Sequence, residues 1–467
     1  MHEIDLDSET KKIALITTTL SSFLTPFMGS SINIALPAIG KELSLSAISL
    51  SWIATVYLLS AAVFLIPVGR IADIAGRKKI FLYGTGIYTL ASFLLALSKS
   101  ILTLILFRIL QGIGSTMLFA TSIAILSSVF PPEERGRVLG INVASVYSGL
   151  SLGPLLGGLL TQNLGWRSIF WINIPLGLLI FVLIITKLPN EWIESRNEKF
   201  DFLGSVIYGV TLVTFIFGLS HILKISGVTL IITSVICLIA FIFWELYYPS
   251  PLLNINLFRS NITFTFSSIA ALINYSANSA VGFLLSLYLQ YIKALTPQSA
   301  GLLLLAQPLT QAFFSPLTGR LSDRVEPRII ASIGMALGFM GLGLLTLIGF
   351  NTSITSIFVI LIFLGLGFGF FSSPNTNAIM SSVDKKFYGV ASATVGTMRL
   401  LGQMVSMGIT MLIFSFYLGP VPISADNHHL FLKSIRVAFI IYTLLSFSGI
   451  FASLARRKIR EINRIKP

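Results

Sequence analysis

Charged residues are scarce in this sequence. Of the 467 residues, 11% are charged and 54% are hydrophobic, and the mean hydropathy is +0.88. A soluble domain carries roughly 25% charged residues, so the composition excludes soluble and disordered chains. We conclude that most of the chain lies in a membrane.

Side chains that support catalysis or bind cofactors are also rare. Cys237 is the one cysteine and lies in an apolar run, so a disulfide within the chain is excluded and a metal cluster is not expected. Of the four histidines only His428 and His429 are neighbours, and they are expected in a solvated loop. The sequence contains no P-loop and no Ser–His–Asp arrangement, and "GLGFGFF" at 365–371 follows no strand pattern. We therefore expect neither an enzyme nor a bound cofactor.

Basic residues exceed acidic ones, which gives a formal net charge of +14. A nucleic-acid-binding domain gathers its basic residues on one face. Here they are spread between apolar stretches along the whole chain. Nucleic acid is therefore not an expected partner.

Apolar runs long enough to cross a bilayer recur along the chain. A transmembrane helix needs about 20 apolar residues, because all of its backbone polar groups must be bonded within the segment. The first twelve residues are polar, and the run after them is too long for a signal peptide, so it is expected to stay as the first span. Fourteen spans are predicted, at residues 13–37, 50–69, 80–98, 102–128, 138–161, 167–186, 202–222, 227–248, 261–291, 298–318, 329–349, 353–380, 389–417 and 432–454.

Lysine and arginine are divided unevenly between the loops on the two sides of these spans. With the N-terminus placed inside, most of them fall in inner loops. The outer loops hold Lys41, Lys99, Arg167, Lys224, Lys293, Lys433 and Arg436. Because basic loops are kept in the cytoplasm, we expect an all-α, multi-pass protein of the plasma membrane with both termini cytoplasmic.

One charged motif occurs twice. Gly69, Arg70 and Asp73 in "GRIADIAGRKK" match Gly319, Arg320 and Asp323 in "GRLSDRVEPR", and "SSVFPPEERGRVLG" at 127–140 is similar to "SSVDKKFYGVAS" at 381–392. Internal repeats of this kind are typical of secondary transporters, in which one half rocks against the other. We predict a six-helix half at 1–190, two additional central helices at 191–254 and a second six-helix half at 255–467.

Further motifs connect the chain with a known family. They are "INIALP" (32–37), "WIATVYLL" (52–59), "RILQGIG" (108–114), "GLSLGPLLGG" (149–158) and "WRSIFWINIPLG" (166–177). Together with the repeated motif they make the chain resemble the major facilitator superfamily, and within it the fourteen-span drug:proton antiporter family. The resemblance implies a monomeric transporter that exports small lipophilic compounds in exchange for protons, by rocker-switch alternating access.

The repeated motif is interpreted as a gate on the cytoplasmic side. Gly69 and Gly76 permit a tight turn there, and Asp73 can pair with Arg70, with Arg77 or with a base on a neighbouring helix. Such pairs at helix ends, repeated at Arg320 and Asp323, can hold that side shut. For Arg77 and the two lysines after it, anchoring at the lipid headgroups is the favoured alternative.

Glycine recurs every fourth residue in the fifth span, at Gly149, Gly153 and Gly157, with Pro154 inserted. Small residues on one face let two helices approach closely. The resemblance makes this stretch the antiporter motif of the family. Packing alone and a role in antiport both remain open at this point.

Polar side chains inside spans are costly and are therefore candidates for function. Arg108 has Gln111 on the same helix face, and Arg399 has Gln403; the alternative is that each arginine bonds backbone carbonyls between helices. The candidate cavity residues are Asn33, Arg108, Gln111, Asn274, Asn278, Gln307, Gln311, Arg399 and Gln403. The candidates for stacking on a lipophilic substrate or for the interfacial belt are Trp52, Tyr57, Tyr147, Trp171 and Tyr275.

No acidic residue lies near the middle of a predicted span. Where the resembling family has an acid in the first span, this chain has Gly29, which leaves Asp73, Asp323 and Glu245 at the membrane borders as the acids available for proton coupling. Two embedded arginines without matching acids suit an anionic or lipid-like cargo. The alternatives to drug:proton antiport are therefore export of such a metabolite without proton coupling, and a non-transporting membrane sensor.

Overall fold

The structure is a computed structural model that describes residues 8–188, 191–194, 198–384 and 387–456. These residues form helices and turns with one isolated β-bridge, between Ser46 and Pro422. Fourteen helical segments are long and apolar enough to cross a membrane. The predicted number of spans is therefore confirmed for the described part of the chain.

The helices fall into three groups along the chain. The first group comprises α1 (Ser8–Leu43), α2 (Ala47–Ala75), α3 (Arg77–Ala96), α4 (Ile101–Val129), α5 (Pro132–Leu164), α6 (Ser168–Trp171) and α7 (Asn173–Lys187). An inserted pair follows, α8 (Phe202–Ser220) and α9 (Ile225–Tyr247). The last group comprises α10 (Ile255–Ser260), α11 (Ile262–Asn278), α12 (Val281–Leu287), a π-helix (Tyr288–Ile292), α13 (Pro297–Leu304), α14 (Ala306–Arg324), α15 (Pro327–Leu345), α16 (Ile354–Ser381), α17 (Tyr388–Tyr417), a 3₁₀ turn (Ala425–Asn427) and α18 (His428–Leu454).

Three predicted spans are interrupted rather than continuous. The sixth breaks between α6 and α7, and the tenth between α13 and α14. Proline explains both breaks, because Pro175 and Pro308 clash with the carbonyl groups of Trp171 and Leu304, four residues earlier. The ninth span breaks between α11 and α12, where the Ala280 backbone N–H donates to Ser406 Oγ of α17 at 3.0 Å.

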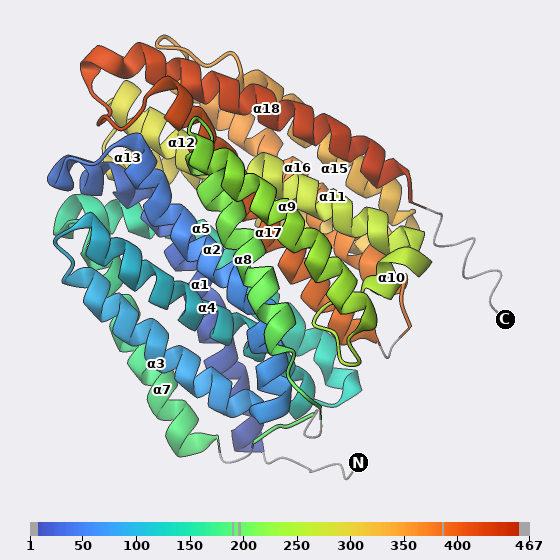
Figure 1. The fold of residues 1–467 in the computed structure, drawn as a ribbon. Helices are drawn as coiled ribbons and strands as arrows, with labels where there is room; N and C mark the ends of the chain where they lie inside the picture. The colour runs from blue at the N-terminus through green and yellow to red at the C-terminus, as the bar shows by residue number, and fades with distance from the viewer. Residues whose placement is uncertain (1–7, 189–190, 195–197, 385–386, 457–467) are drawn as a thin grey trace.

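Both halves are bundles of long helices that run from upper left to lower right in Figure 1. In Figure 1 the helix α1 begins near the bottom of the view and α18 ends on its right-hand side, and we call the end of the bundle that holds both the terminal end. The turns α2–α3, α4–α5 and α14–α15 also lie there, and the turns α1–α2, α3–α4 and α12–α13 lie at the opposite end. This places the two copies of the charged motif at the same end of the molecule.

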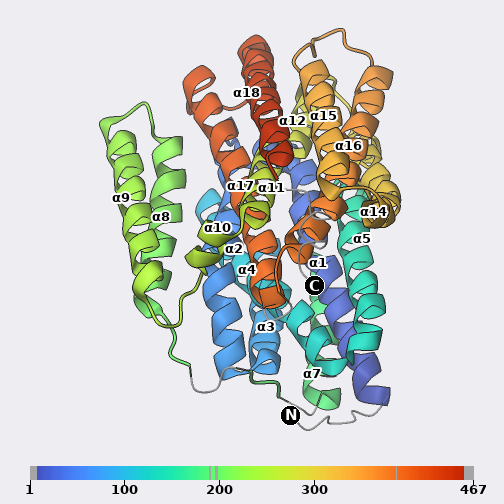
Figure 2. The ribbon, with the colours of Figure 1, turned by 90° about the vertical axis from the view of Figure 1, so that its right-hand side faces the viewer.

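The inserted helices α8 and α9 stand as a pair beside the two halves (Figure 2). The helix α8 contacts both halves: Tyr208 donates to the Ala62 carbonyl of α2 at 3.2 Å, and Ile216 packs against Gly408 of α17. The predicted boundary at residue 190 lies outside the described residues, and the division into 1–190, 191–254 and 255–467 stays a prediction.

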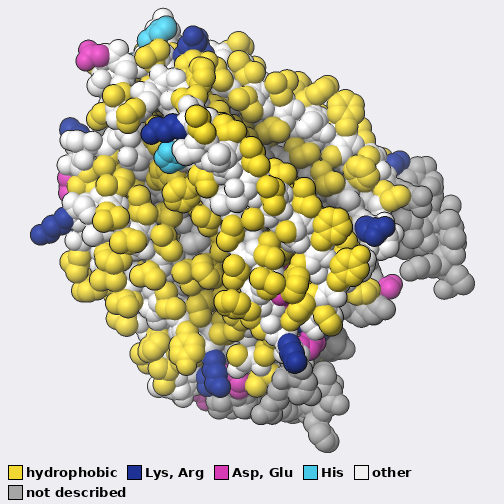
Figure 3. Space-filling view, viewed as in Figure 1, with side chains coloured by type: hydrophobic (Ala, Val, Ile, Leu, Met, Phe, Trp, Pro, Cys, Tyr) yellow, Lys and Arg dark blue, Asp and Glu magenta, His cyan; other side chains and the backbone are white. Residues whose placement is uncertain are grey.

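The outer surface is mainly hydrophobic. In Figure 3 apolar side chains cover most of the face shown, and charged side chains gather toward its margins. This distribution is the one expected for a protein whose flank contacts lipid and whose two ends contact water.

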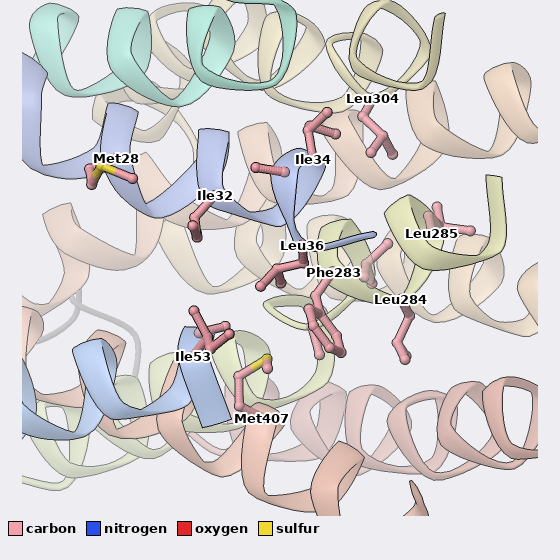
Figure 4. Packing of buried hydrophobic residues seen from close by; sticks show 14 of the residues in the cluster. Met28, Ile32, Ile34, Leu36, Ile53, Phe283, Leu284, Leu285, Leu304 and Met407 are labelled. Carbon is pink, nitrogen blue, oxygen red and sulfur yellow. The ribbon is translucent and has the colours of Figure 1, made fainter. Parts of the chain in front are cut away.

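Several contacts between the halves lie toward the opposite end. Ser286 Oγ of α12 donates to the Asn33 carbonyl of α1 at 2.6 Å, and Gln290 Nε2 donates to the Ile34 carbonyl at 3.0 Å. Apolar side chains fill the space beside them: Figure 4 shows Leu36 of α1 next to Phe283 of α12. The halves are therefore closely packed at this end.

Candidate functional site

Arg108 lies in the interior of the first half and is fully buried. From α4 its Nε donates to the Ile53 carbonyl of α2 at 3.1 Å, and its Nη1 donates to Gln111 Oε1 at 2.8 Å. The guanidinium carbon lies 4.3 Å from the centre of the Tyr57 ring. The structure thus shows the contact that the sequence left open, a bond from the arginine to a backbone carbonyl across a helix interface.

The partners of Arg108 extend this network through the first half. Gln111 Nε2 donates to Ser92 Oγ of α3 at 3.0 Å. The Tyr57 hydroxyl donates to Ser115 Oγ of α4 at 2.7 Å and lies 3.3 Å from the Thr25 carbonyl of α1. One buried polar network therefore joins α1, α2, α3 and α4, and Gln111 belongs to it as the i, i+3 spacing predicts.

Arg399 lies between the two halves. It is half-buried on α17, and its guanidinium carbon lies 4.7 Å from the centre of the Phe119 ring of α4. A cation over an aromatic face is attracted by the quadrupole of the ring, by ~0.5–2 kcal/mol according to burial. Arg399 forms no ion pair with a carboxylate among the described residues. Its positive charge is therefore left for another partner.

Aromatic and hydroxyl groups from both halves lie in the neighbourhood of this arginine. Tyr275 of α11 lies within electrostatic range of Arg399 and Tyr147 and within hydrogen-bonding reach of Ser372. The hydroxyl groups of Tyr147 (α5) and Ser372 (α16) are 3.4 Å apart. We call Phe119, Tyr147, Tyr275, Ser372 and Arg399 the interface cluster. Sequence reasoning had proposed the two tyrosines and the arginine, but nothing in the sequence connected them with Phe119 or Ser372.

The remaining polar candidates are spread over the second half and α1. Asn274 and Asn278 are buried on α11, and Asn278 Nδ2 donates to the Asn274 carbonyl at 2.9 Å. Gln311 is buried on α14, whereas Asn33, Gln307 and Gln403 are half-buried on α1, α14 and α17. The structure confirms that the two asparagines share a face. The assignment of these side chains to a substrate cavity stays a prediction.

The glycines of the fifth span lie against α1. A Cβ atom at Gly149 would lie 2.4 Å from the Phe23 carbonyl, one at Gly153 would lie 1.8 Å from Ser30 Oγ, and one at Gly157 would lie 2.7 Å from Ser31 Cβ. No real Cβ atom fits at such distances, so glycine is required for this close packing. Close packing thus accounts for the stripe, and a part in antiport stays a prediction.

The same stretch of α5 also contacts the second half. A Cβ atom at Gly301 of α13 would lie 2.1 Å from the Pro154 carbonyl, and one at Gly158 would lie 2.4 Å from the Pro297 carbonyl. The two glycines therefore let α5 and α13 touch backbone to backbone. This contact joins the halves toward the opposite end of the molecule.

The first copy of the charged motif forms the α2–α3 turn. Gly76 has a φ of +118°, a value that L side chains rarely adopt. Asp73 and Arg77 form an ion pair at 2.8 Å, and Arg77 Nη1 also donates to Ser128 Oγ of α4 at 2.6 Å. The Arg77 side chain is 11% exposed. The guanidinium group of Arg77 is thus engaged by Asp73 and by Ser128 of α4, and its anchoring at lipid headgroups stays a prediction.

A short acidic segment after α7 lies on this turn, and we call it the acidic strap (residues 191–194 and 198). Glu191 accepts hydrogen bonds from the Lys78 and Lys79 backbone N–H groups at 2.8 and 3.2 Å. Backbone bonds hold the strap as well: the Arg77 N–H donates to the Trp192 carbonyl at 3.0 Å, and the Glu194 N–H donates to the Asp73 carbonyl at 3.1 Å.

Ion pairs complete the binding of the strap. Arg77 pairs with Glu194, and Arg70 pairs with Glu198. Glu191 satisfies free N–H groups at the start of α3, where a negative charge is also favoured by the helix dipole. The charged turn is thus bound to the acidic strap, which connects α7 of the first half to the inserted helix α8. The sequence did not reveal these contacts, because the acids lie more than a hundred residues away along the chain.

Alanine at Gly76 is expected to detach the strap. The added Cβ atom would lie 2.5 Å from the Glu191 carboxyl carbon, and the residue would keep a strained positive φ. We expect a loss of about 1–3 kcal/mol in the free energy of unfolding, measured as a lower thermal unfolding midpoint of the purified protein. Gly69→Ala is the control, because a Cβ atom there meets nothing within 4 Å. Equal midpoints for the two variants would contradict the account.

The second copy of the motif is arranged differently. Asn377 Nδ2 of α16 donates to Asp323 Oδ1 at 3.3 Å and to Ser322 Oγ at 2.8 Å, and Arg320 is exposed. The position that corresponds to Arg77 is Pro327, so Asp323 has no arginine at i+4. The i, i+4 ion pair of the first copy therefore has no counterpart at i, i+4 in the second.

The described residues contain no group of three or more His, Cys, Asp or Glu side chains that could hold a metal ion. Arg108 and Arg399 are the two arginines that the sequence singled out inside spans. Arg108 is bonded within one half, whereas Arg399 lies on α17 of the second half against Phe119 of the first.

Comparison with known proteins settles the family. The model of the Major Facilitator Superfamily matches residues 18–273 and 267–467. The chain belongs to the Major Facilitator Superfamily. It is a transporter of that superfamily and lies in a lipid bilayer.

Named members of the superfamily are similar over most of the chain. The riboflavin transporter RibZ of Clostridioides difficile (strain 630) is 31% identical over 394 residues, which are 84% of this chain and 85% of that protein. The multidrug resistance protein Stp of Mycobacterium tuberculosis is 28% identical over 410 residues, which are 86% and 75% of the two chains. The crystal structure of a bacterial homologue of the human lysosomal transporter Spinster shares the fold, with a TM-score of 0.68, 17% identity and coverage of 96% and 97%.

Proposed function

We propose that this protein is a secondary transporter that exports small lipophilic compounds across the plasma membrane by rocker-switch alternating access. The observation that carries the proposal is the interface cluster, in which Arg399 and Tyr275 of the second half meet Phe119 and Tyr147 of the first. When the two halves rock against each other, a binding site built from both of them changes the side from which it is accessible, as alternating access requires. Neither an enzyme nor a passive scaffold needs such a site.

The proposal includes an orientation. With both termini in the cytoplasm, as the basic loops favour, the terminal end faces inward and the opposite end faces outward. The contacts of α1 with α12 and of α5 with α13 then close the outer side. In this conformation a compound reaches the interface cluster from the cytoplasm, and export requires the outer contacts to separate.

The relatives support two kinds of cargo. Stp is named for multidrug resistance, and RibZ is named for riboflavin. An aromatic cluster accepts planar lipophilic rings of either kind, since stacking on Phe119 and the tyrosines does not depend on one hydrogen-bond pattern. The second candidate function, export of an anionic or lipid-like metabolite, is favoured by the positive charge of Arg399, which has no carboxylate partner in the described residues.

Proton antiport is part of the first candidate and not of the second. A Cβ atom at Gly29 would meet nothing within 4 Å, so α1 has open space where the resembling family has an acid. An exporter of cations needs a carboxylate that exchanges a proton for its cargo. The open space at Gly29 therefore favours the second candidate, and proton coupling is the property that separates the two.

Transport in everted membrane vesicles tests these proposals. A proton gradient is imposed, a pH-sensitive dye reports proton movement, and cationic, neutral and anionic lipophilic compounds are added in turn, with riboflavin among the neutral ones. Proton release with cationic compounds supports drug:proton antiport. Uptake of an anion or of a neutral compound without proton movement supports the second candidate. Failure to move any compound would contradict both.

Alanine at Arg399 is expected to separate the cargo classes. The substitution removes the positive charge from the interface cluster but leaves the Phe119 and Tyr275 rings, so transport of anionic compounds should fall at least tenfold while neutral compounds are retained. A loss of one charged hydrogen bond, about 1.5–3 kcal/mol, gives an effect of that size. Initial rates in the vesicles measure it, with Arg259→Ala, an exposed arginine of α10, as control. Equal loss of anionic and neutral transport would contradict the role.

A further inference from the structure

Two carboxyl groups face each other at the base of the inserted helix pair. Asp201 directly precedes α8, and Glu245 lies in the last turn of α9; their residues are 1% and 2% exposed. The two side chains are within hydrogen-bonding reach of each other. Neither forms an ion pair with a lysine or an arginine in the described part of the chain. Two buried carboxylates without a cation repel each other. A bound proton or cation is therefore needed to offset this repulsion.

The two carboxyl groups differ in the hydrogen bonds that they accept. Asp201 accepts from the Gly204 N–H at 2.8 Å, as the cap of α8, and from Trp244 Nε1 at 3.0 Å. These donors favour the ionised form of Asp201. Glu245 Oε2 accepts from the Leu253 N–H at 2.8 Å, whereas Glu245 Oε1 is buried and has no partner that donates a hydrogen bond to it.

The unpartnered oxygen of Glu245 and an oxygen of Asp201 lie beside the same residue, Gly204. A Cβ atom at Gly204 would lie 2.3 Å from Asp201 Oδ2 and 2.8 Å from Glu245 Oε1, so these two oxygen atoms lie beside the same glycine. A hydrogen bond between two carboxyl groups exists only when one of them carries a proton. Among the described residues the site has two carboxyl groups and no third acidic, histidine or cysteine ligand, which suits a proton better than a metal ion.

We propose that Asp201 and Glu245 form a proton-binding site in which Glu245 Oε1 carries the proton and donates it to Asp201 Oδ2. The site ties together the two ends of the inserted pair. Asp201 is the N-cap residue of α8. Glu245 accepts a hydrogen bond from the Leu253 N–H, in the segment that connects α9 to the second half. Loss of the proton leaves two adjacent negative charges, and the base of the pair then separates.

Other charged groups on the packed helices are engaged elsewhere or exposed. On α2, Arg70 pairs with Glu198 and Asp73 pairs with Arg77. On α17, Arg399 stacks on Phe119, and Arg259 of α10 is exposed. The pH response of this joint is therefore assigned to the carboxyl pair.

The stability of the purified full-length protein as a function of pH tests the site. In the wild type the native state binds a proton that the unfolded chain releases, so the thermal midpoint should fall by several degrees as the pH is raised from acidic to alkaline. Glu245→Gln should remove this slope, because its amide donates to Asp201 at every pH while its oxygen still accepts from Leu253. Asp201→Asn replaces the other carboxyl group of the pair and should also remove the dependence of the thermal midpoint on pH.

The control is Glu134→Gln, which removes an exposed acid of α5 and should keep the wild-type slope. Infrared spectra at neutral pH should show a protonated carboxyl band in the wild type that is lost in Glu245→Gln. A flat wild-type profile, or the wild-type slope in both variants of the pair, would overturn the proposal. A midpoint that follows sodium or potassium concentration at fixed pH would overturn it as well, since the occupant would be a metal cation. None of these measurements depends on the transported compound.

Discussion

Lysine at Arg108 is expected to destabilise the protein by about 3 kcal/mol, even though the positive charge is kept. The arginine bonds the Ile53 carbonyl and Gln111 in two directions at once, and its planar group lies on the Tyr57 ring. An ammonium group is a point charge and reproduces neither the two directions nor the stacking. The Ile53 carbonyl or Gln111 would then be left unpaired in a buried place.

Unfolding of the purified protein in detergent, followed by circular dichroism, measures this effect. Arg399→Lys is the matched control, because Arg399 is half-buried and makes its aromatic contact at the interface between the halves; it should unfold close to the wild type. If Arg108→Lys were as stable as the wild type but inactive in transport, the network would not be structural, and the role of Arg108 as a cavity residue would be favoured.

Alanine at Gly301 is expected to push the two halves apart toward the opposite end. Its Cβ atom would lie 2.1 Å from the Pro154 carbonyl, and backbone on both sides leaves no flexible side chain to move away. Overpacking of this kind costs about 1–3 kcal/mol, which lowers the population of the conformation closed at that end roughly 5–150-fold. Transport should fall strongly, because a conformation of the cycle is lost.

Cross-linking of introduced cysteines measures this shift. Gln162 Oε1 of α5 accepts from the Gln298 N–H of α13 at 3.2 Å, so cysteines at these two positions, in a Cys237→Ser background, report closure. The rate of disulfide formation should be lower in Gly301→Ala than in the parent. Gly140→Ala is the control on α5, since a Cβ atom there meets nothing within 4 Å. An unchanged rate in Gly301→Ala would contradict the account.

Much of the architecture could be predicted from the sequence, because contact with lipid requires apolar residues in each segment that crosses the membrane. A helix that crosses a bilayer must be apolar along its own length, and so the number of spans could be counted and is confirmed by the structure. The spacing of Gly149, Gly153 and Gly157 indicated close helix packing for the same reason, since the three residues share a face by their spacing alone. The interruptions at Pro175 and Pro308 also have a local cause, although the predicted spans ran through them.

The site was predicted less completely, because its contacts join residues that are far apart along the chain. Arg108 and Gln111 are neighbours on one helix and could be paired from their spacing. The contact of Arg399 with Phe119 could not be found in this way, because it depends on how the two halves meet. The motif turn gives a similar case: Asp73 was expected to pair with a nearby base and does so, whereas the contact of Glu191 with the start of α3 depends on a segment that folds back over the turn.

The sequence by itself determined the membrane class, the fourteen spans and a stripe of small residues in the fifth span, all of which depend on composition and local spacing, and its motifs carried the superfamily resemblance. The tertiary structure alone decided which charges are paired. It buried Arg108 in a network of one half, left Arg399 between the halves, covered Arg77 with the acidic strap, and brought Asp201 against Glu245. The physical reason is that the energy of a charge depends on its neighbours in space, and these are fixed only when the helices have packed.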